Sequence, residues 1–222
     1  MGGIGGLQYY VPEENAFRTI AFDGSSFLHI MCVVQLRSGE IWAGSSGRGI
    51  FRIRKDTGTG SLITDIPEVS EHAHYGAIYE DRQGTIWIGE NGTGLLRYEP
   101  SARTSKMYAK TVLDGGSSIS GMAEDQSGNF LLSTSTTAYY YDKEYDRFTP
   151  IEHNESWLPM RSILVSQQGT RYLATFGKGL KVIQPDLKEL RTESVTLPFF
   201  DFNNSKVSTL FEDSDQNLMM GC

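Results

Sequence analysis

Short stretches of apolar and β-branched residues alternate with polar, glycine-containing stretches along the chain, and residues 72–115 show this pattern most clearly. Four stretches with strand-forming composition follow one another there: 74–80, 85–88, 95–98 and 105–109. Asp81-Arg82-Gln83-Gly84 separates the first and second stretches, and Asn91-Gly92-Thr93-Gly94 separates the second and third. Glycine readily adopts the positive φ angles that tight turns require. The segment therefore predicts four short antiparallel strands joined by turns.

The same unit recurs along the chain with a period of about 44 residues. A turn glycine occupies one marker position in each copy: Gly39, Gly84, Gly128 and Gly169, at intervals of 45, 44 and 41 residues, and a fifth copy places Gln216 there, 47 residues further on. A large side chain stands three residues after each marker position: Trp42, Trp87, Leu131, Tyr172 and Met219. Because Trp42 and Trp87 occupy equivalent positions, we predict that they pack between neighbouring repeats.

Four strands in a repeat of this length are typical of β-propeller blades, whereas helical repeats would place apolar residues at i, i+3, i+4 and i+7. Residues 5–10 match residues 93–98, the back half of a copy, and the last copy reaches the end of its second strand at Gly221. We therefore predict a single all-β domain over residues 1–222, a β-propeller of four-stranded blades with about five blades. It would comprise four full repeats and two complementary half-blades. These fit either a closed five-bladed ring, which removes exposed sheet edges, or part of a larger propeller.

The clearest copy reads E-D-x-x-G-x-I-W-I-G followed by G-x-G-L-x-R-Y, from Glu80-Asp81 to Tyr98, and weaker versions cover nearly the whole chain. This pattern resembles the two-component regulator propeller repeat. The resemblance implies a part of the extracytoplasmic, periplasmic sensor of a hybrid two-component system, a class that detects oligosaccharides. Full sensors of that family carry further propeller, immunoglobulin-like, membrane and kinase parts, so other domains of a parent protein are expected partners.

Charge and composition exclude several functions. The 27 acidic and 20 basic residues give a net charge of −7, and no run of Lys or Arg occurs, so nucleic acid is not an expected partner. No apolar stretch is long enough to predict a membrane segment, and no signal peptide is visible at the start. Cys32 and Cys222 form no disulfide framework or metal motif, and their redox state stays open, although Cys32 reads as a small buried residue.

Few residues could carry catalysis or hold a metal. His72 and His74 would lie on one face of a strand, but no third ligand recurs nearby, so we predict no metal site. No Gly-x-Ser-x-Gly motif marks a serine hydrolase. The pairs Glu80-Asp81 and Glu124-Asp125 recur at the hairpin turn, where aspartate can bond its own turn amides, so we interpret them as structural. We therefore predict no catalytic residue, no cofactor and no enzymatic activity.

Residues that break the repeat are the candidates for ligand binding. In a blade, the loop that leads into the first strand (the lead-in loop) and the loop between the second and third strands (the 2–3 loop) share one face, where rigid scaffolds present recognition residues. Trp157, on a lead-in loop, has no tryptophan counterpart in the other copies. The predicted ligand-binding residues are Trp157, His153 and Arg161 around that loop, Phe176 and Lys178 on the 2–3 loop of the same copy, Arg48, Glu90 and Asn91 on other 2–3 loops, and Tyr75 at the start of a first strand.

An aromatic surface edged by polar donors and acceptors suits a sugar ring, so we predict binding of an oligosaccharide or another small polar ligand without chemistry. The plainer role for Trp157 is to cap the core under its loop. Two other functions stay open. Streptogramin-lyase-type propellers have similar Gly-x-Ile-Trp repeats, but a lyase needs an acid/base set, such as His153 within hydrogen-bonding reach of a carboxylate. A protein-interaction scaffold would instead present a large apolar patch.

Overall fold

The computed structural model describes residues 2–3, 5–22, 28–113, 118–153, 159–184, 190–192 and 206–221. The chain divides into two compact units, Met1–Ala109 and Lys110–Cys222. Within the described residues, both units consist almost wholly of antiparallel sheets, with the 3-10 helices η1 (Pro12–Glu14) and η2 (Lys110–Leu113) as the helical elements. The all-β prediction is therefore confirmed.

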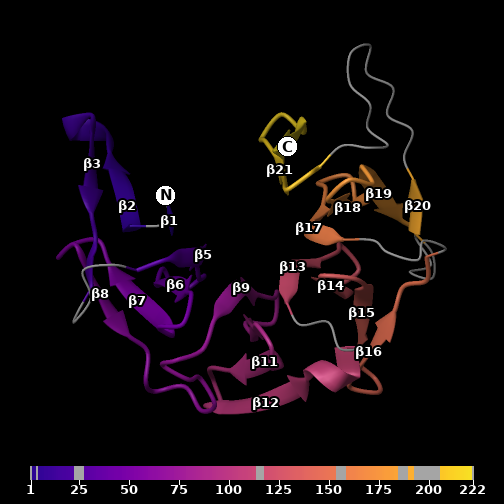
Figure 1. Ribbon diagram of the computed structural model, residues 1–222, viewed down its shortest axis with the longest axis horizontal. Coiled ribbons are helices and arrows are strands. Elements are labelled where there is room, and N and C mark those ends of the chain that lie inside the picture. Colours follow the sequence, from indigo (N-terminus) through magenta and orange to yellow (C-terminus); the bar gives the residue numbers. More distant parts are fainter. Residues whose placement is uncertain are drawn as a thin grey trace. The chain divides into compact units, whose positions relative to one another are not determined.

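The first unit contains three sheets in its described part (Figure 1). The first sheet consists of β1 (Gly2–Gly3), β2 (Gly6–Val11) and β3 (Ala16–Thr19). The second consists of β5 (Ile30–Gln35), β6 (Ile41–Ser45), β7 (Ile50–Arg54) and β8 (Thr59–Leu62), with β4 (Ala21–Phe22) parallel to β8. The third consists of β9 (Tyr75–Glu80), β10 (Ile86–Glu90), β11 (Gly94–Glu99) and β12 (Thr104–Ala109). These last four strands lie where the sequence predicts them.

The second unit repeats the plan (Figure 1). One four-stranded sheet consists of β13 (Ile119–Glu124), β14 (Phe130–Thr134), β15 (Ala138–Asp142) and β16 (Arg147–Pro150). The next consists of β17 (Met160–Val165), β18 (Arg171–Thr175), β19 (Leu180–Ile183) and β20 (Leu190–Thr192), and a hairpin of β21 (Thr209–Glu212) and β22 (Leu218–Gly221) follows. The strands of each four-stranded sheet pair in chain order, as blades require. The closure of the repeats into a five-bladed ring stays a prediction.

The marker position ends a hairpin turn that an aspartate organises. The carboxylate of Asp81 accepts hydrogen bonds from the backbone N–H groups of Gln83 and Thr85, at 2.9 and 3.0 Å. Gly84 closes this turn with φ +89°, and the marker glycines of the other copies also have φ between +80° and +89°. Gln216 adopts the same left-handed conformation, with φ +66°. The structural interpretation of Asp81 is thus confirmed, and the fifth copy has the same turn without the glycine.

The glutamate before this aspartate ties neighbouring sheets together. Glu80 Oε2 accepts a hydrogen bond of 2.6 Å from the backbone N–H of Arg37, in the hairpin turn of the preceding sheet. In the second unit, Glu212 Oε2 accepts a bond of the same length from the N–H of Gln167. A carboxylate at the end of a first strand therefore joins two consecutive repeats in both units.

Apolar side chains pack between consecutive sheets. In the first unit, Trp42, Ile50, Tyr75 and Ile78 belong to one buried cluster between the β5–β8 and β9–β12 sheets. In the second unit, the sheets β13–β16 and β17–β20 bury a similar cluster. The first strands lie beside one another in both cases, β5 beside β9 and β13 beside β17. The predicted position of Trp42 is confirmed, while Trp87, 1% exposed, stacks on Tyr108 of its own sheet.

Candidate functional site

The lead-in loop and the 2–3 loop of a sheet are hydrogen-bonded to each other. The backbone N–H of Ser46 donates to the carbonyl oxygen of His29 at 2.9 Å, and that of Asn91 donates to His74 at 2.8 Å. In the second unit, the N–H of Phe176 donates to Pro159 at 2.8 Å. The two loops of each of these sheets therefore lie at the same end, as predicted, and we call this end of a sheet its loop face.

Each first strand of the four full repeats is irregular next to its loop face. The register with the second strand shifts there, and one residue of the first strand is left without a partner: Met31, Gly76, Ser120 or Arg161. A bulge of this kind leaves the extra residue unpaired and changes the direction of its side chain. In β17 the extra residue is Arg161, which is the charged member of the set.

Four predicted binding residues belong to the first unit. Glu90 pairs with Tyr75 in the sheet, and Asn91 follows it in the chain, so these three residues lie together. Glu90 Oε1 accepts a hydrogen bond of 2.8 Å from the hydroxyl of Thr93. Arg48 lies on the 2–3 loop of the preceding sheet. It lines a hollow of about 300 Å³ with Phe51, Leu62, Glu71 and His72.

Tyr75 is fully buried, so its ring offers no surface to a ligand in this structure. Its hydroxyl accepts a hydrogen bond of 2.8 Å from the backbone N–H of Ser70, in the lead-in loop. Burial raises the pKa of Tyr75 to about 12, so the phenol stays protonated at neutral pH. The contribution of this residue is to hold the lead-in loop on the sheet.

A histidine and a serine from consecutive repeats meet on the loop face of the first unit. Ser46 Oγ lies 3.0 Å from His74 Nδ1, within hydrogen-bonding distance. From the sequence, His74 is considered only together with His72, as a candidate for metal binding. Its contact with Ser46 is not predicted, because Ser46 is 28 residues away in the chain. In the described part of the chain, no group of three or more His, Cys, Asp and Glu side chains could hold a metal ion.

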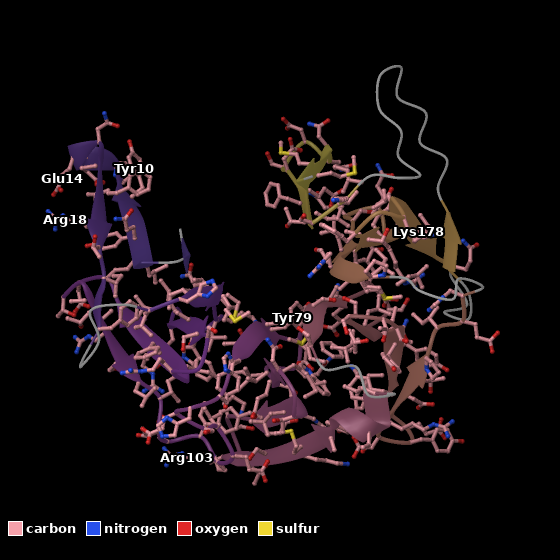
Figure 2. All side chains as sticks on the ribbon, viewed as in Figure 1. Tyr10, Glu14, Arg18, Tyr79, Arg103 and Lys178 are labelled. Carbon is pink, nitrogen blue, oxygen red and sulfur yellow. The ribbon has the colours of Figure 1, made fainter. Side chains whose placement is uncertain are left out.

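Two predicted residues of the second unit are in contact. The guanidinium carbon of Arg161 lies 5.1 Å from the centre of the Phe176 ring. Lys178 is exposed and lies in the turn between β18 and β19 (Figure 2). The structure adds Lys206, whose Nζ lies 4.8 Å from the same ring and whose backbone forms an isolated antiparallel bridge with Phe176. The predictions from the sequence do not include Lys206. Its position in the repeat could have indicated it, because Lys206 stands ten residues before the marker position of its copy, as His74 does.

His153 and Trp157 belong to the lead-in loop of β17. His153 is half-buried, and its Nδ1 atom is buried without a hydrogen-bond partner among the described residues. Trp157 lies outside the described residues, so its part in a binding surface stays a prediction.

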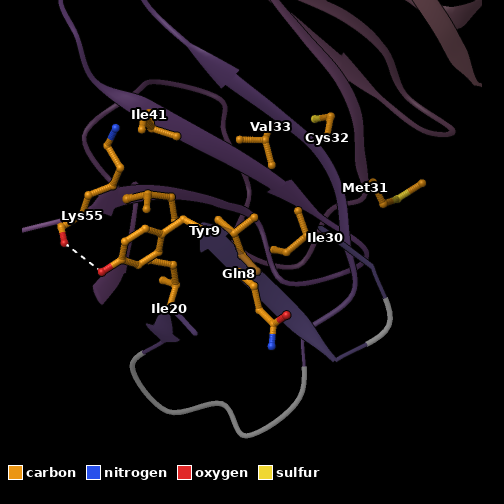
Figure 3. A pocket seen from close by; sticks show the side chains of 11 residues that line it. Gln8, Tyr9, Ile20, Ile30, Met31, Cys32, Val33, Ile41 and Lys55 are labelled. Atoms are coloured by element: carbon orange, nitrogen blue, oxygen red, sulfur yellow. Dashed lines mark hydrogen bonds between the residues drawn. The ribbon is translucent and has the colours of Figure 1, made fainter. Parts of the chain in front are cut away.

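A separate apolar cavity of about 460 Å³ lies in the first unit, between β2 and β5 (Figure 3). Leu7, Tyr9, Ile20, Ile30 and Val33 are among its lining residues, and the Tyr9 hydroxyl donates a hydrogen bond of 3.4 Å to the carbonyl of Lys55. None of the predicted binding residues lines this cavity. Its apolar wall does not match the chemistry of a sugar.

Antiparallel sheets with strands in chain order, packed through their first strands and carrying their loops at one end, define the chain as a β-propeller with four-stranded blades. Residues 71–92 match the model of the two-component regulator propeller family. This match lies within one copy of the repeat, from the end of its lead-in loop to its 2–3 loop. Among curated protein sequences, none matches the chain significantly.

Solved structures with this fold include extracellular domains of two-component systems. The extracellular domain of the hybrid two-component system BT3049 from B. thetaiotaomicron has 18% identity and a TM-score of 0.78, over 98% of this chain and 29% of that one. That of BT4673, from the same organism, has 16% identity and a TM-score of 0.77, over 98% and 30%. The chain thus spans less than a third of these extracellular domains. Virginiamycin B lyase from Staphylococcus aureus has 12% identity and a TM-score of 0.67, over 96% and 66%.

In the part of the chain that the structure describes, no helix has the length and apolar character needed to span a membrane.

Proposed function

We propose that this chain is a ligand-binding part of the extracytoplasmic, periplasmic sensor of a two-component signalling protein, and that its ligand is an oligosaccharide or a similar polar molecule. It acts together with further propeller or signalling domains of the parent protein. The proposal is supported by the match of residues 71–92 to the propeller repeat and by the fold that the chain shares with extracellular domains of two hybrid two-component systems.

The observation that carries the binding role is the contact between Arg161 and Phe176 on one loop face. Both residues break the repeat: the equivalent extra residues of the other first strands are Met31, Gly76 and Ser120, and the residues equivalent to Phe176 are Ser46, Asn91 and Ser135. A guanidinium group over an aromatic ring brings hydrogen-bond donors and apolar ring surface together, and a sugar ring needs both kinds of contact.

A ligand on this face can signal without chemistry, because the loops of consecutive sheets are joined. The N–H of Gly49 donates to the carbonyl of Ala73 at 3.4 Å, and the N–H of Val207 donates to Thr175 at 2.9 Å. A ligand that binds one arrangement of these loops more tightly shifts the population toward it, by as much as its difference in affinity. The packing of adjacent blades, or of a partner domain, would carry that change onward.

In the part of the chain that the structure describes, the lyase alternative lacks the buried acid/base pair that would support it. Among the described residues, His153 has no carboxylate within hydrogen-bonding distance, and His74 pairs with a serine. His72 lies 3.5 Å from Glu71, its neighbour in the chain, but its side chain is 83% exposed to water. We expect no turnover when the purified chain is incubated with virginiamycin B, and measurable opening of that substrate would favour the lyase.

A thermal-shift screen against a panel of oligosaccharides tests the proposal, because a ligand that binds the native state raises the melting temperature. At a ligand concentration of about 100 times Kd, the stabilisation is about 2.7 kcal/mol. If no member of the panel raises the melting temperature, the proposal is wrong.

Trp157→Ala then tests the predicted aromatic surface. We expect weaker binding of any hit and an unchanged melting temperature without ligand. Tyr145→Ala is the matched control, since Tyr145 is 63% exposed in a turn of the same unit. Unchanged affinity in Trp157→Ala would remove Trp157 from the binding surface.

A further inference from the structure

The same two repeat positions meet in both units, where a lead-in loop contacts the preceding 2–3 loop. His74 contacts Ser46 in the first unit, and Lys206 contacts Phe176 in the second. His74 and Lys206 each stand ten residues before the marker position of their copy, whereas Ser46 and Phe176 each stand seven residues after theirs. The two contacts are therefore equivalent, but the second unit has a cation and an aromatic ring where the first has an imidazole and a hydroxyl.

The second-unit contact gathers positive charge. Arg161 and Lys206 each lie about 5 Å from the centre of the Phe176 ring, at 5.1 and 4.8 Å. The two charges are therefore less than ~10 Å apart, which is about one Debye length at 0.1 M salt, so water and salt screen their repulsion only in part. Lys178, two residues after Phe176, adds an exposed ammonium group on the same 2–3 loop.

In the part of the chain that the structure describes, Arg161 and Lys206 have no acidic partner, unlike many of the other cations. Arg18, Arg54, Arg97 and Arg171 each lie within ion-pair distance of a carboxylate. In the described residues, neither Arg161 nor Lys206 does, and the ring of Phe176 is the side chain that both contact. A ring quadrupole attracts cations but does not neutralise them. Two cations held at one ring are thus arranged to receive an anion.

We propose that Arg161, Phe176 and Lys206 form a subsite for a negatively charged sugar, either a uronic acid or a sulfate ester. The inference rests on the proposed function and specifies the class of its ligand. Arg161 offers the planar, paired N–H donors that match the oxygens of a carboxylate or sulfate, and Lys206 adds a point charge. Phe176 supplies apolar surface for the sugar ring that carries the anion.

The chain carries a net charge of −7, so the attraction of an anion to Arg161 and Lys206 acts only close to these two residues. The chain as a whole repels a long polyanion, whereas a short ligand with one or two charges interacts mainly with the groups within a Debye length. The subsite therefore selects an acidic oligosaccharide rather than a nucleic acid.

Calorimetric titration with tetrasaccharides of uronic acids, sulfated tetrasaccharides and neutral tetrasaccharides tests this inference. We expect an acidic member to bind at least about tenfold more tightly than every neutral one at about 0.05 M salt, and to lose that advantage as salt rises to about 0.5 M. The uronate and sulfate arms distinguish the two sources of the charge.

Lys206→Gln and Arg161→Gln should each weaken binding of the acidic ligand by about tenfold, and Lys206→Gln should leave binding of neutral sugars unaffected. Arg147→Gln is the matched control, because Arg147 lies 5.0 Å from the ring centre of the exposed Tyr145 in the same unit. It should change nothing. Binding of neutral sugars alone, or binding of acidic sugars that neither substitution weakens, would overturn this inference and leave the proposed function standing. No binding of any sugar would overturn both.

Discussion

The indole N–H of Trp87 donates a hydrogen bond of 2.9 Å to Asp81 Oδ2, six residues earlier in the chain. The other oxygen of the same carboxylate accepts the turn amides of Gln83 and Thr85. Trp87 is 1% exposed and Asp81 is 3% exposed. The aspartate and the tryptophan of the repeat motif are therefore one unit, in which the carboxylate shapes the turn and satisfies a buried donor.

Substitution of Asp81 separates these two roles. Asp81→Asn keeps an oxygen for the turn amides but cannot accept from the indole, so we expect a loss of about 1–3 kcal/mol in the free energy of unfolding. Asp81→Ala removes all three bonds and should cost more. Urea unfolding measures both. The control is Asp213→Asn, where the corresponding donor is the exposed Asn217 side chain, and it should change stability by less than about 0.5 kcal/mol. Equal losses at the two sites would contradict this account.

A buried ion pair joins consecutive repeats in the second unit and should make stability depend on pH. Arg171 Nη2 lies 2.6 Å from Asp125 Oδ2, and their side chains are 13% and 1% exposed. Burial by itself would raise the pKa of Asp125, but hydrogen bonds from Asn129 and Arg171 outweigh it and lower the pKa below its usual value. A lowered pKa in the folded state gives stability that is present above about pH 4 and is lost as the pH falls through the folded pKa.

Arg171→Met should therefore destabilise the chain by about 3–5 kcal/mol at neutral pH, since it leaves a buried carboxylate unpaired. The difference from the unsubstituted chain should shrink as the pH falls from about 7 to about 3, because protonation of Asp125 removes that charge. Urea unfolding across this range measures it, with Arg171→Lys as a milder variant and Arg147→Met as an exposed control. A difference that does not change with pH would show that packing alone accounts for the loss.

The left-handed conformation of Gln216 predicts a stabilising substitution. Residues with a Cβ pay about 1–2 kcal/mol in this region, and the other marker positions are occupied by glycine. Gln216→Gly should raise the free energy of unfolding by about 0.5–1 kcal/mol, after the greater backbone freedom of glycine in the unfolded chain is subtracted. Thermal unfolding measures the change. Asp215→Gly, at a residue outside the left-handed region, should not stabilise, and equal gains at both positions would refute the explanation.

The thiol of Cys32 should be unreactive in the folded chain. Burial raises its pKa to about 11, although a hydrogen bond with the backbone of Gly44 opposes the shift, so little thiolate exists near neutral pH. In a Cys222→Ser background, we expect a disulfide reagent at about pH 8 to label the native chain at least about 100-fold more slowly than the urea-unfolded chain. The Cys32→Ser variant, which keeps Cys222, gives the labelling rate of the Cys222 thiol for comparison. Similar native and unfolded rates would mean that the strand β5 opens readily.

Much of the fold could be predicted because each repeat forms its strands locally. The strands of residues 72–115 begin and end within two residues of their predicted bounds, since turn residues and β-branched runs are neighbours in the chain.

The candidate site could be predicted only in part. Arg161 and Phe176 come from one repeat, and the sequence shows that both differ in residue type from the equivalent residues of the other repeats. The contacts of Lys206 with Phe176 and of Ser46 with His74 join different repeats, and no local pattern reports them.

Tyr75 illustrates the same limit. As an aromatic residue at the start of a strand, it has the composition of a binding residue, but the adjacent sheet covers it and the Ser70 amide takes its hydroxyl. The sequence by itself determined the β-sheet repeat, its period and the turn that aspartate and glycine build, because these depend on residues within one repeat. Only the tertiary structure decided which side chains remain accessible and which cations share a ring, because those properties depend on how one repeat packs against the next.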